Sequence, residues 1–394
     1  MSEPHIHSPQ YDVIIAHGPG CRDGATAAWC VWRTLSLTYR NTLAQEGGFY
    51  SDKDPQCGKS NERTTGSFEP YVHPNSPEGA MRLQARGFPV VFVFMQPGEQ
   101  APIKLVENKN VVILDLDMGD ALVPLVRAAK RVLLSDHHDS TPLTIAKYSN
   151  ILFEECRHKF ATFVNTNKSE SGATLAWELT HGTKNPPFIE TVRIGDTWQW
   201  HEYPELKARE VLKSLHVYKV FRSFVDIENA FEYWDENFQS HAEEGMIITD
   251  YETALVKQMA KQCDIGYLQT NDGHVYTLAY TQANILHSEV GASMKWYAQK
   301  RFKVPIHFCA TWKYVSHKGV VSVSLRDPGD NINLATIARS VKGTDGKGGG
   351  HASASGFVFY GLENFHNYIS KTPPITTLNN SWTPITSLKE PYLP

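Results

Sequence analysis

The residues best suited to chemistry are histidines and acids that follow apolar runs of the chain. Imidazole nitrogens and carboxylate oxygens gathered in such number repel or strain one another unless cations neutralise them, and this mixture of donors suits Mn²⁺ or Mg²⁺. Two such ions can clamp a phosphoryl group and activate a water molecule for in-line displacement. The candidates for such a site are His17, Cys21, Asp23, Asp115, Asp136, His137, His138 and Asp196.

Cys21 allows two interpretations. As a thiolate ligand it is softer than a carboxylate and favours Mn²⁺, Zn²⁺ or Fe²⁺ over Mg²⁺. As a small buried thiol it would leave the first ion weakly held. The six cysteines of the chain form no CxxC pair, which argues against a disulfide framework and favours a reducing compartment. Asp117 is interpreted as a solvated neighbour of Asp115, not as a ligand.

The elements that must position these residues are four short apolar runs at 11–17, 90–95, 111–115 and 131–138. Near-continuous apolar runs are typical of strands buried on both faces of a parallel sheet. Helical patterns alternate with the runs, which predicts an open α/β sheet. Ligands of such sheets bind outside the carboxyl ends of the strands. We therefore expect the polar residues to meet at one edge of the sheet.

The rest of the chain is predicted to contain an insertion, a helical segment and a second α/β domain. Residues 46–88 are rich in Gly, Pro, Ser and Asn and show no sustained period, so they are interpreted as a surface insertion. The segment 205–263 is helical in pattern. Its apolar residues recur every four positions and predict one buried stripe; they are Ile247, Tyr251, Leu255 and Met259. Beyond it, Asn271-Asp272-Gly273 between two strand patterns predicts a hairpin.

These patterns predict domain boundaries. The expected divisions are a catalytic domain at 10–225, a helical linker at 226–265, a smaller α/β domain at 266–360 and a Pro-containing tail at 361–394. The two domains are expected to be joined by helices, with a cleft between them.

The order of the motifs resembles the DHH phosphoesterase superfamily, whose namesake triplet is present as Asp136-His137-His138. The likeness covers nearly the whole chain apart from the insertion and the tail, although the commonest form of the family has aspartate where this chain has Cys21. The resemblance implies that Asp136 lies behind the histidines and fixes their rings, and that His138 faces the substrate phosphate. It also implies a bridging Asp115 between two ions, with His17 and Cys21 at one ion and Asp23, His137 and Asp196 at the other.

The second domain resembles the DHH-associated C-terminal domain of RecJ-type exonucleases and oligonucleotide hydrolases. The likeness rests on Arg326 and on the run Gly348-Gly349-Gly350-His351. Consecutive glycines expose backbone N–H groups to an anion, and arginine offers a planar fork to phosphate. We expect these residues to bind the substrate.

The expected function is hydrolysis of phosphodiester bonds in short oligonucleotides or dinucleotides, in the manner of an exonuclease. Two divalent ions are the expected cofactors, with Mn²⁺ first and Mg²⁺ or another transition metal as alternatives. The net charge of −4 gives no global attraction to a long polyanion. We expect a cytoplasmic protein without a membrane partner, because no signal peptide or transmembrane pattern is present.

Two other functions remain open at this stage. One is a phosphatase that acts on pyrophosphate, polyphosphate or nucleotide monoesters. The other is a non-catalytic module that binds nucleic acid ends. The sequence indicates neither base preference nor cleavage polarity nor oligomeric state.

Overall fold

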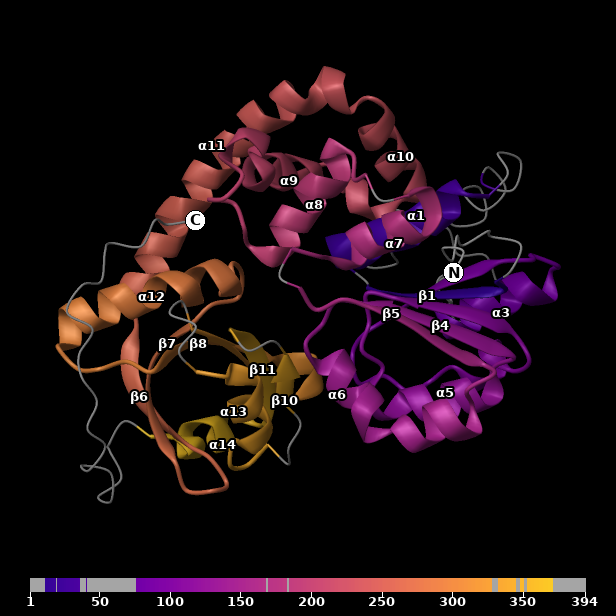
Figure 1. Cartoon of the computed structure of the whole chain (residues 1–394). Coiled ribbons are helices and arrows are strands. Elements are labelled where there is room, and N and C mark those ends of the chain that lie inside the picture. The colour runs from indigo at the N-terminus through magenta and orange to yellow at the C-terminus, as the bar shows by residue number, and fades with distance from the viewer. Residues whose placement is uncertain are drawn as a thin grey trace, which may run out of the picture. The chain divides into compact units, whose positions relative to one another are not determined.

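The computed structural model describes residues 11–18, 20–35, 40, 76–167, 169–182, 184–327, 332–344, 348–350 and 353–370 (Figure 1). Two compact units divide the chain: an N-terminal unit, Met1–Ile248, and a C-terminal unit, Thr249–Pro394. Among the described residues, no helix combines the length and apolarity that crossing a membrane requires.

The N-terminal unit contains a five-stranded parallel sheet with the order β2-β1-β3-β4-β5. Its strands are β1 Val13–His17, β2 Val91–Met95, β3 Asn110–Leu114, β4 Arg131–Asp136 and β5 Phe160–Val164. Chain order reverses at β1, which has β2 on one side and β3 on the other. Such a switch point opens a crevice at the carboxyl ends of the strands. The predicted parallel α/β sheet is confirmed.

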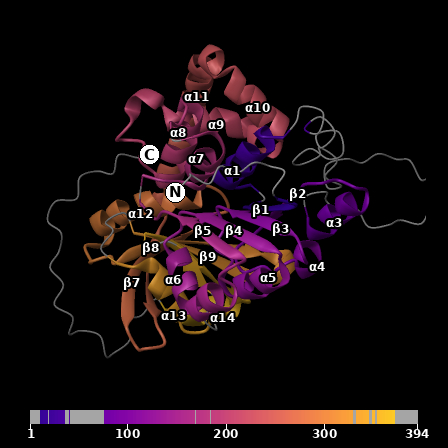
Figure 2. The same cartoon turned by 45° about the vertical axis from the view of Figure 1, so that its right-hand side comes forward.

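Both faces of this sheet are covered, which explains why its strands are apolar throughout. Ile14 and Ala16 of β1 face one core and Val13 and Ile15 face another, because successive side chains point to opposite faces. In both views α1 and α7 lie on one side of the sheet and α5 and α6 on the other (Figures 1 and 2). The helices of this unit up to α10 are α1 Arg22–Arg33, α3 Pro77–Ala85, α4 Ile103–Val106, α5 Leu122–Ala128, α6 Ser140–Lys147, α7 Gly172–His181, α8 Pro187–Thr197, α9 Ala208–Val217 and α10 Phe224–Glu232.

Helix α3 lies inside the stretch that was predicted to be an irregular insertion. It begins after Ser76, whose side chain accepts a hydrogen bond from the Gly79 amide and caps the helix. Ala80 and Leu83 are buried in the same core as β2. Only three residues of this helix are buried, and one of them is a glycine, so the sequence shows no clear apolar period here. Residues 46–75 of the predicted insertion lie outside the described residues.

Helix α11, Trp234–Lys261, corrects half of the predicted buried stripe, since only Leu255 and Met259 of its four residues are partly buried. Ile247 is 72% exposed and Tyr251 is 67% exposed. Small residues face the protein instead: a Cβ atom on Gly245 would lie 1.7 Å from the carbonyl oxygen of Glu210. The four-residue spacing identifies one face of a helix but does not say which face packs. Here close approach of α9 to a glycine decides the packing.

The C-terminal unit contains a seven-stranded mixed sheet with the order β10-β11-β9-β8-β7-β6-β12. Only β7 and β8 pair in parallel; the other pairs are antiparallel. The strands are β6 Asp264–Gln269, β7 Val275–Gln282, β8 Phe308–Val315, β9 Val320–Arg326, β10 Gly348–Gly350, β11 Ala354–Tyr360 and β12 Ile369–Ser370, and the helices are α12 His287–Phe302, α13 Leu334–Ser340 and α14 Leu362–Tyr368. The predicted second α/β unit and its β6–β7 hairpin are confirmed.

Regular structure continues past the predicted end of the second domain at residue 360. Phe365 of α14 and Ile369 of β12 are buried in the core of the mixed sheet. The remaining tail, 371–394, lies outside the described residues. Short turns of helix complete the two units: η2 Gly119–Ala121, η3 Asn150–Glu155, η4 Pro204–Leu206, η5 Val220–Arg222 and η6 Ser316–Lys318.

Candidate metal centre

The predicted ligands of the N-terminal unit come together at the carboxyl edge of its sheet. His17 ends β1, Asp115 directly follows β3, and Asp136 ends β4. Asp23 comes from the first turn of α1. Asp196 comes from the last turn of α8.

Three overlapping groups of side chains in this region could hold a metal ion. In each group, one donor atom from every residue lies within 4.8 Å of the others. The groups are His17, Cys21 and Asp115; Asp23, His137 and Asp196; and Asp115, Asp136, His137 and His138. Residues that are far apart in the sequence therefore share one small volume.

Asp115 lies at the centre of these groups. Its Oδ2 atom is 3.5 Å from Nδ1 of His17 and 3.6 Å from Sγ of Cys21. Its Oδ1 atom is 3.2 Å from Nε2 of His137. This Oδ1 atom is buried, and no hydrogen bond from the described residues satisfies it. A buried carboxylate oxygen that faces an imidazole but lacks a well-aligned hydrogen bond is costly, and a cation at this point would satisfy it.

The backbone of Asp115 is in the left-handed region, with φ of 55°. Such a conformation is uncommon outside glycine, although aspartate and asparagine adopt it more readily than most residues. Gly172 at the start of α7 packs directly against the Asp115 side chain: a Cβ atom on Gly172 would lie 2.4 Å from Cβ and 2.7 Å from Oδ1 of Asp115. No motif in the sequence points to Gly172, which directly follows Ser171, the N-cap of α7.

Asp23 is fixed by the N-terminus of α7. Its Oδ2 atom accepts a hydrogen bond of 2.5 Å from the Gly172 amide, and its Oδ1 atom accepts one of 2.9 Å from the Ala173 amide. Burial raises the pKa of Asp23 well above its usual range, and the charges of Asp115 and Asp196 raise it further. A cation is the partner that would relieve this repulsion.

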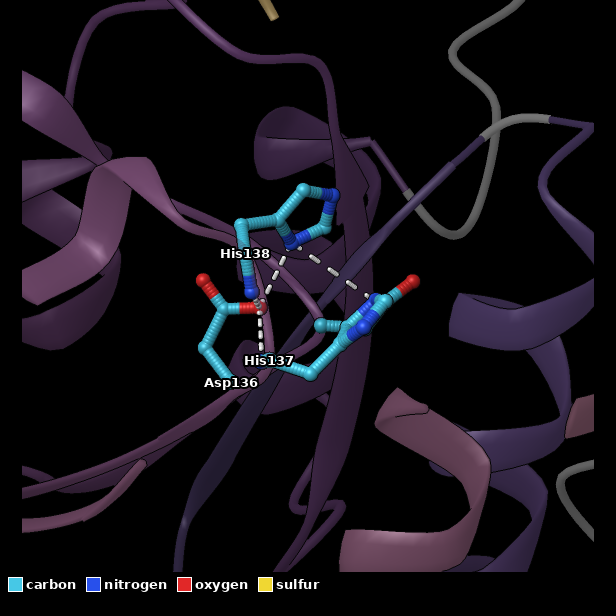
Figure 3. A group of neighbouring side chains, drawn as sticks. Asp136, His137 and His138 are labelled. Atoms are coloured by element: carbon cyan, nitrogen blue, oxygen red, sulfur yellow. Dashed lines mark hydrogen bonds and ion pairs between the residues drawn. The ribbon is translucent and has the colours of Figure 1, made fainter. Parts of the chain in front are cut away.

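Asp136 organises the loop that carries the two histidines (Figure 3). Its Oδ1 atom accepts hydrogen bonds from the His137 amide at 2.8 Å and from the His138 amide at 3.4 Å, and lies 2.7 Å from Nδ1 of His138. Its other oxygen accepts a hydrogen bond from the hydroxyl of Thr141. Asp136 is fully buried, so its carboxylate acts as a fixed support for the histidine pair.

The two histidines carry positive charge in this arrangement. Burial lowers the pKa of His137, but contact with Asp115 and the charges of Asp115, Asp196 and Asp23 outweigh it and raise the pKa to about 11. Burial likewise lowers the pKa of His138, and its bond to Asp136 raises the pKa to about 9. In the absence of a cation, the positive charges of the two imidazoles thus compensate the negative charges of the carboxylates. Divalent cations would do the same.

The pKa of Asp115 is shifted in the opposite direction from the pKa values of the two histidines. Burial alone would raise its pKa, but the imidazoles of His137 and His17 outweigh burial and hold the pKa of Asp115 well below its usual range. Asp115 is therefore ionised, as a ligand must be.

One side of the centre is open. The side chain of Asp196 is 30% exposed, and those of His17 and His138 are 21% exposed. Asp23 and Asp115 are only 1% exposed. A substrate that approaches the centre therefore meets Asp196, His17 and His138 first.

Cys21 has a structural role as the N-cap of α1. Its Sγ atom accepts a hydrogen bond of 3.4 Å from the Gly24 amide. Burial raises the pKa of the Cys21 thiol, and the charges of Asp115 and Asp196 raise it further. The thiol is thus protonated in the absence of a cation.

The predicted substrate residues of the C-terminal unit lie at one end of its sheet. Arg326 pairs with Ala354, and Gly350 pairs with Ser355, the residue next to Ala354. The Arg326 guanidinium donates to the hydroxyls of Ser288 at 2.6 Å and Ser324 at 2.9 Å.

The three glycines of the run differ in how much space surrounds them. A Cβ atom on Gly349 would meet nothing within 4 Å, whereas Gly348 and Gly350 pack closely against backbone. Among the described residues, the space beside the Cα atom of Gly349 is therefore open. His351 lies outside the described residues.

No family model matches the chain. Among curated proteins it is similar to the uncharacterized protein R106 of Acanthamoeba polyphaga mimivirus, with 21% identity over 378 residues that cover 92% of this chain and 72% of the relative. Among solved structures it is similar to the pGpG-specific phosphodiesterase PggH from Vibrio cholerae. That likeness covers 90% of this chain and 95% of the other, with 14% identity and a TM-score of 0.37. Similarity at this level carries no argument about function, which must come from the site.

Proposed function

We propose that the chain is a divalent-metal-dependent phosphodiesterase of the DHH type that acts on short oligonucleotides or dinucleotides. One observation carries the proposal: Asp115 belongs to one group of metal-ligand side chains and lies beside His137 of a second group. Its Oδ2 atom faces His17 and Cys21, and its Oδ1 atom faces His137. A carboxylate that presents one oxygen to each group suits a bridge between two ions.

The donor set fits two divalent ions. His17, Cys21 and Asp115 would hold one ion, and Asp23, His137 and Asp196 would hold the other. The Oδ1 atom of Asp115 lies 3.2 Å from Nε2 of His137 in the second group. Imidazole and carboxylate together suit Mn²⁺, and the thiol of Cys21 tilts the first position toward softer ions. When bound, such ions supply positive charge for a phosphoryl group and lower the pKa of water.

The chain's own residues supply orientation and charge at the open side of the site. Asp136 fixes His138 through a contact of 2.7 Å, and its negative charge favours the protonated form of the ring. A protonated, partly exposed imidazole can donate a charge-assisted hydrogen bond to a phosphate oxygen. His138 is therefore proposed to orient the substrate.

The second unit is proposed to hold the far end of the substrate. Gly349 leaves open space beside its backbone, and Arg326 lies at the same end of the sheet. Gly348, Gly350 and His351 complete the proposed binding loop. This part of the proposal rests on the resemblance of the GGGH run and Arg326 to a known substrate-binding domain.

The test is hydrolysis of a panel of substrates with added Mn²⁺. The panel contains dinucleotides (pGpG among them), pyrophosphate, a nucleotide monoester and a chromogenic phosphodiester. We expect turnover of the diesters. Preferential turnover of pyrophosphate or of the monoester would replace the proposal with a phosphatase. Metal binding without any turnover would replace it with a binding module.

Asp115→Asn should lower kcat/KM for the diester at least about 100-fold, because metal sites contribute several kcal/mol to such reactions. The matched control is Asp117→Asn. Asp117 accepts hydrogen bonds from the Gly119 amide and from Thr144, and it belongs to none of the metal-ligand groups among the described residues. Equal activity of the two variants would contradict the proposed role of Asp115.

A further inference from the structure

A pocket of about 490 Å³ lies in the C-terminal unit, between the end of α11 and the second half of α12. The two helices meet there, since Arg301 of α12 donates a hydrogen bond to the carbonyl oxygen of Lys261 on α11 (Figure 1). The pocket is lined by Lys257, Lys261, Trp296, Tyr297, Lys300 and Arg301. None of these residues belongs to the candidate metal centre or to the proposed substrate loop.

The charge of this pocket is entirely positive. Its lining contains three lysines and one arginine and no acidic residue. In the part of the chain that the structure describes, none of these four cations has an ion pair within 4.0 Å. The whole chain carries a net charge of −4, so this local positive field is a departure from the average surface. Such a pocket attracts an anion.

Helix termini explain part of this charge. Arg301 donates to the carbonyl oxygens of Lys261 at 3.3 Å and Cys263 at 3.1 Å, so it caps the end of α11. Lys261 and Lys300 are in the last turns of their helices, where cations offset the helix dipole. Lys257 lies a turn earlier, and the dipole does not account for it. The dipole also does not account for the two aromatic rings.

The rings of Trp296 and Tyr297 give the pocket two perpendicular flat surfaces. Their centroids are 4.8 Å apart and their planes meet at 87°. The ammonium of Lys300 lies 4.7 Å from the centroid of Trp296, and that of Lys261 lies 5.8 Å from the centroid of Tyr297. Both rings are half-buried, so each presents part of its surface to the pocket. Aromatic surfaces beside cations suit a ligand that has both a flat ring and a phosphate.

We propose that this pocket is a second binding site, for single-stranded nucleic acid. Lys257, Lys261 and Lys300 bind its phosphates, and Trp296 or Tyr297 stacks on a base. Sequence-independent binding of single strands combines these two contacts elsewhere in proteins. A purely anionic ligand, such as inorganic polyphosphate, would use the lysines but not the rings. The inference does not depend on hydrolysis.

The test measures binding of a fluorescein-labelled 12-nucleotide oligo(dT) to the full chain by anisotropy, in EDTA so that no metal-dependent turnover occurs. The double variant Lys257→Gln/Lys300→Gln should weaken binding on the order of tenfold. It should also reduce the slope of log Kobs against log salt by about 1.4, which is about 0.7 for each lost phosphate contact. A loss of folding alone would not change this slope in a defined way.

The matched control is Lys104→Gln/Lys130→Gln, which removes the same charge from two exposed lysines of the N-terminal unit. We expect it to bind as the wild type does. Equal weakening by the two double variants would overturn the proposal, because the effect would then come from net charge. Absence of oligonucleotide binding by the wild type would overturn it as well.

The stacking half of the proposal has its own variant. Trp296→Leu should weaken binding roughly 5-fold to 150-fold, the range seen when one stacked base is lost, while the salt slope stays unchanged. Wild-type affinity in Trp296→Leu, together with equal competition by inorganic polyphosphate, would show an anion site and contradict the assignment to nucleic acid. A chain that binds oligonucleotide here but hydrolyses no diester would contradict only the proposed function.

Discussion

Asp115 illustrates which features of a site the sequence predicts and which it does not. Its position after an apolar run predicted a place at the sheet edge, and the structure places it there. Three further features were not predictable: a φ of 55°, a buried oxygen without a hydrogen-bond donor, and contact with Gly172. They depend on how α7 packs, which no pattern around Asp115 encodes.

Gly172→Ala should displace Asp115 and weaken metal binding, because the new Cβ atom would lie 2.4 Å from Cβ of Asp115. We expect a loss of at least about tenfold in Mn²⁺ affinity, in line with changes to residues that support metal ligands. Isothermal titration calorimetry measures the affinity.

Ser171→Ala is the matched control for Gly172→Ala. It removes the cap of α7 and should cost about 1 kcal/mol of stability, but it leaves the space beside Asp115 unchanged. Equal metal affinity in Gly172→Ala and Ser171→Ala would show that α7 does not position Asp115.

Cys21→Asp should shift metal preference from softer ions toward Mg²⁺. Replacing a thiol with a carboxylate hardens the donor set of His17, residue 21 and Asp115. The ratio of Zn²⁺ to Mg²⁺ affinity, measured by competition with a fluorescent chelator, should fall at least about tenfold. An unchanged ratio would favour the second interpretation of Cys21, a thiol that leaves the first ion weakly held, and would leave the cap of α1 as its role in the structure.

At the scale of elements, buried strands were easier to predict than helix faces. A strand covered on both sides leaves an unbroken apolar run, and all four such runs are strands of one sheet. Helix α11 shows the opposite case. Its exposed face carries Ile247 and Tyr251, while Gly245 contacts the backbone of Glu210. Hydrophobicity alone therefore misplaced the first half of the stripe, because close packing of a small residue decided the contact there.

The helices that carry Asp23 and Gly172 are held together by an aromatic cluster. Trp29 of α1 is fully buried and stacks near Trp177 of α7, with centroids 6.3 Å apart. Trp29→Ala should destabilise the chain by about 3–5 kcal/mol. Trp198→Ala, at a position that is 42% exposed, should cost less than about 1 kcal/mol. Urea unfolding compares them, and similar losses would contradict this account of the core.

The stability of the C-terminal unit should depend on pH, because a histidine hydrogen-bonds to β7 where β8 begins. The Thr277 amide donates a 2.9 Å hydrogen bond to Nδ1 of His307. Burial lowers the pKa of His307 by more than the backbone contact with Thr277 raises it, and the charge of Lys295 lowers it further. The unfolded chain, in which histidine has a pKa of about 6.5, therefore binds the proton first as pH falls. The stabilising contribution of neutral His307 is present above that value and is lost as pH falls through the folded pKa.

His307→Asn keeps an acceptor near Nδ1 and removes the titration. The urea midpoint should fall less for this variant than for the wild type between pH 7.5 and pH 5.5. Parallel shifts in the two proteins would show that other groups control the pH dependence.

At the scale of the whole molecule, the acidic site and the cationic site belong to different units. Carboxylates dominate the candidate metal centre of the N-terminal unit, and the cationic pocket belongs entirely to the C-terminal unit. The average charge of −4 hides this division. Composition therefore predicted the absence of a global attraction to nucleic acid, but it could not predict a local site. The local site forms only because α11 and α12 pack against each other, which composition does not encode.

The central claim is that Asp115 joins two ligand groups into one centre for two divalent ions. Titration of the purified chain with Mn²⁺, followed by the electron paramagnetic resonance signal of the unbound ion, tests it most directly. We predict two bound ions per chain for the wild type and for Asp117→Asn, and at most one for Asp115→Asn. The same stoichiometry in all three proteins, or no bound Mn²⁺ in the wild type, would contradict the account.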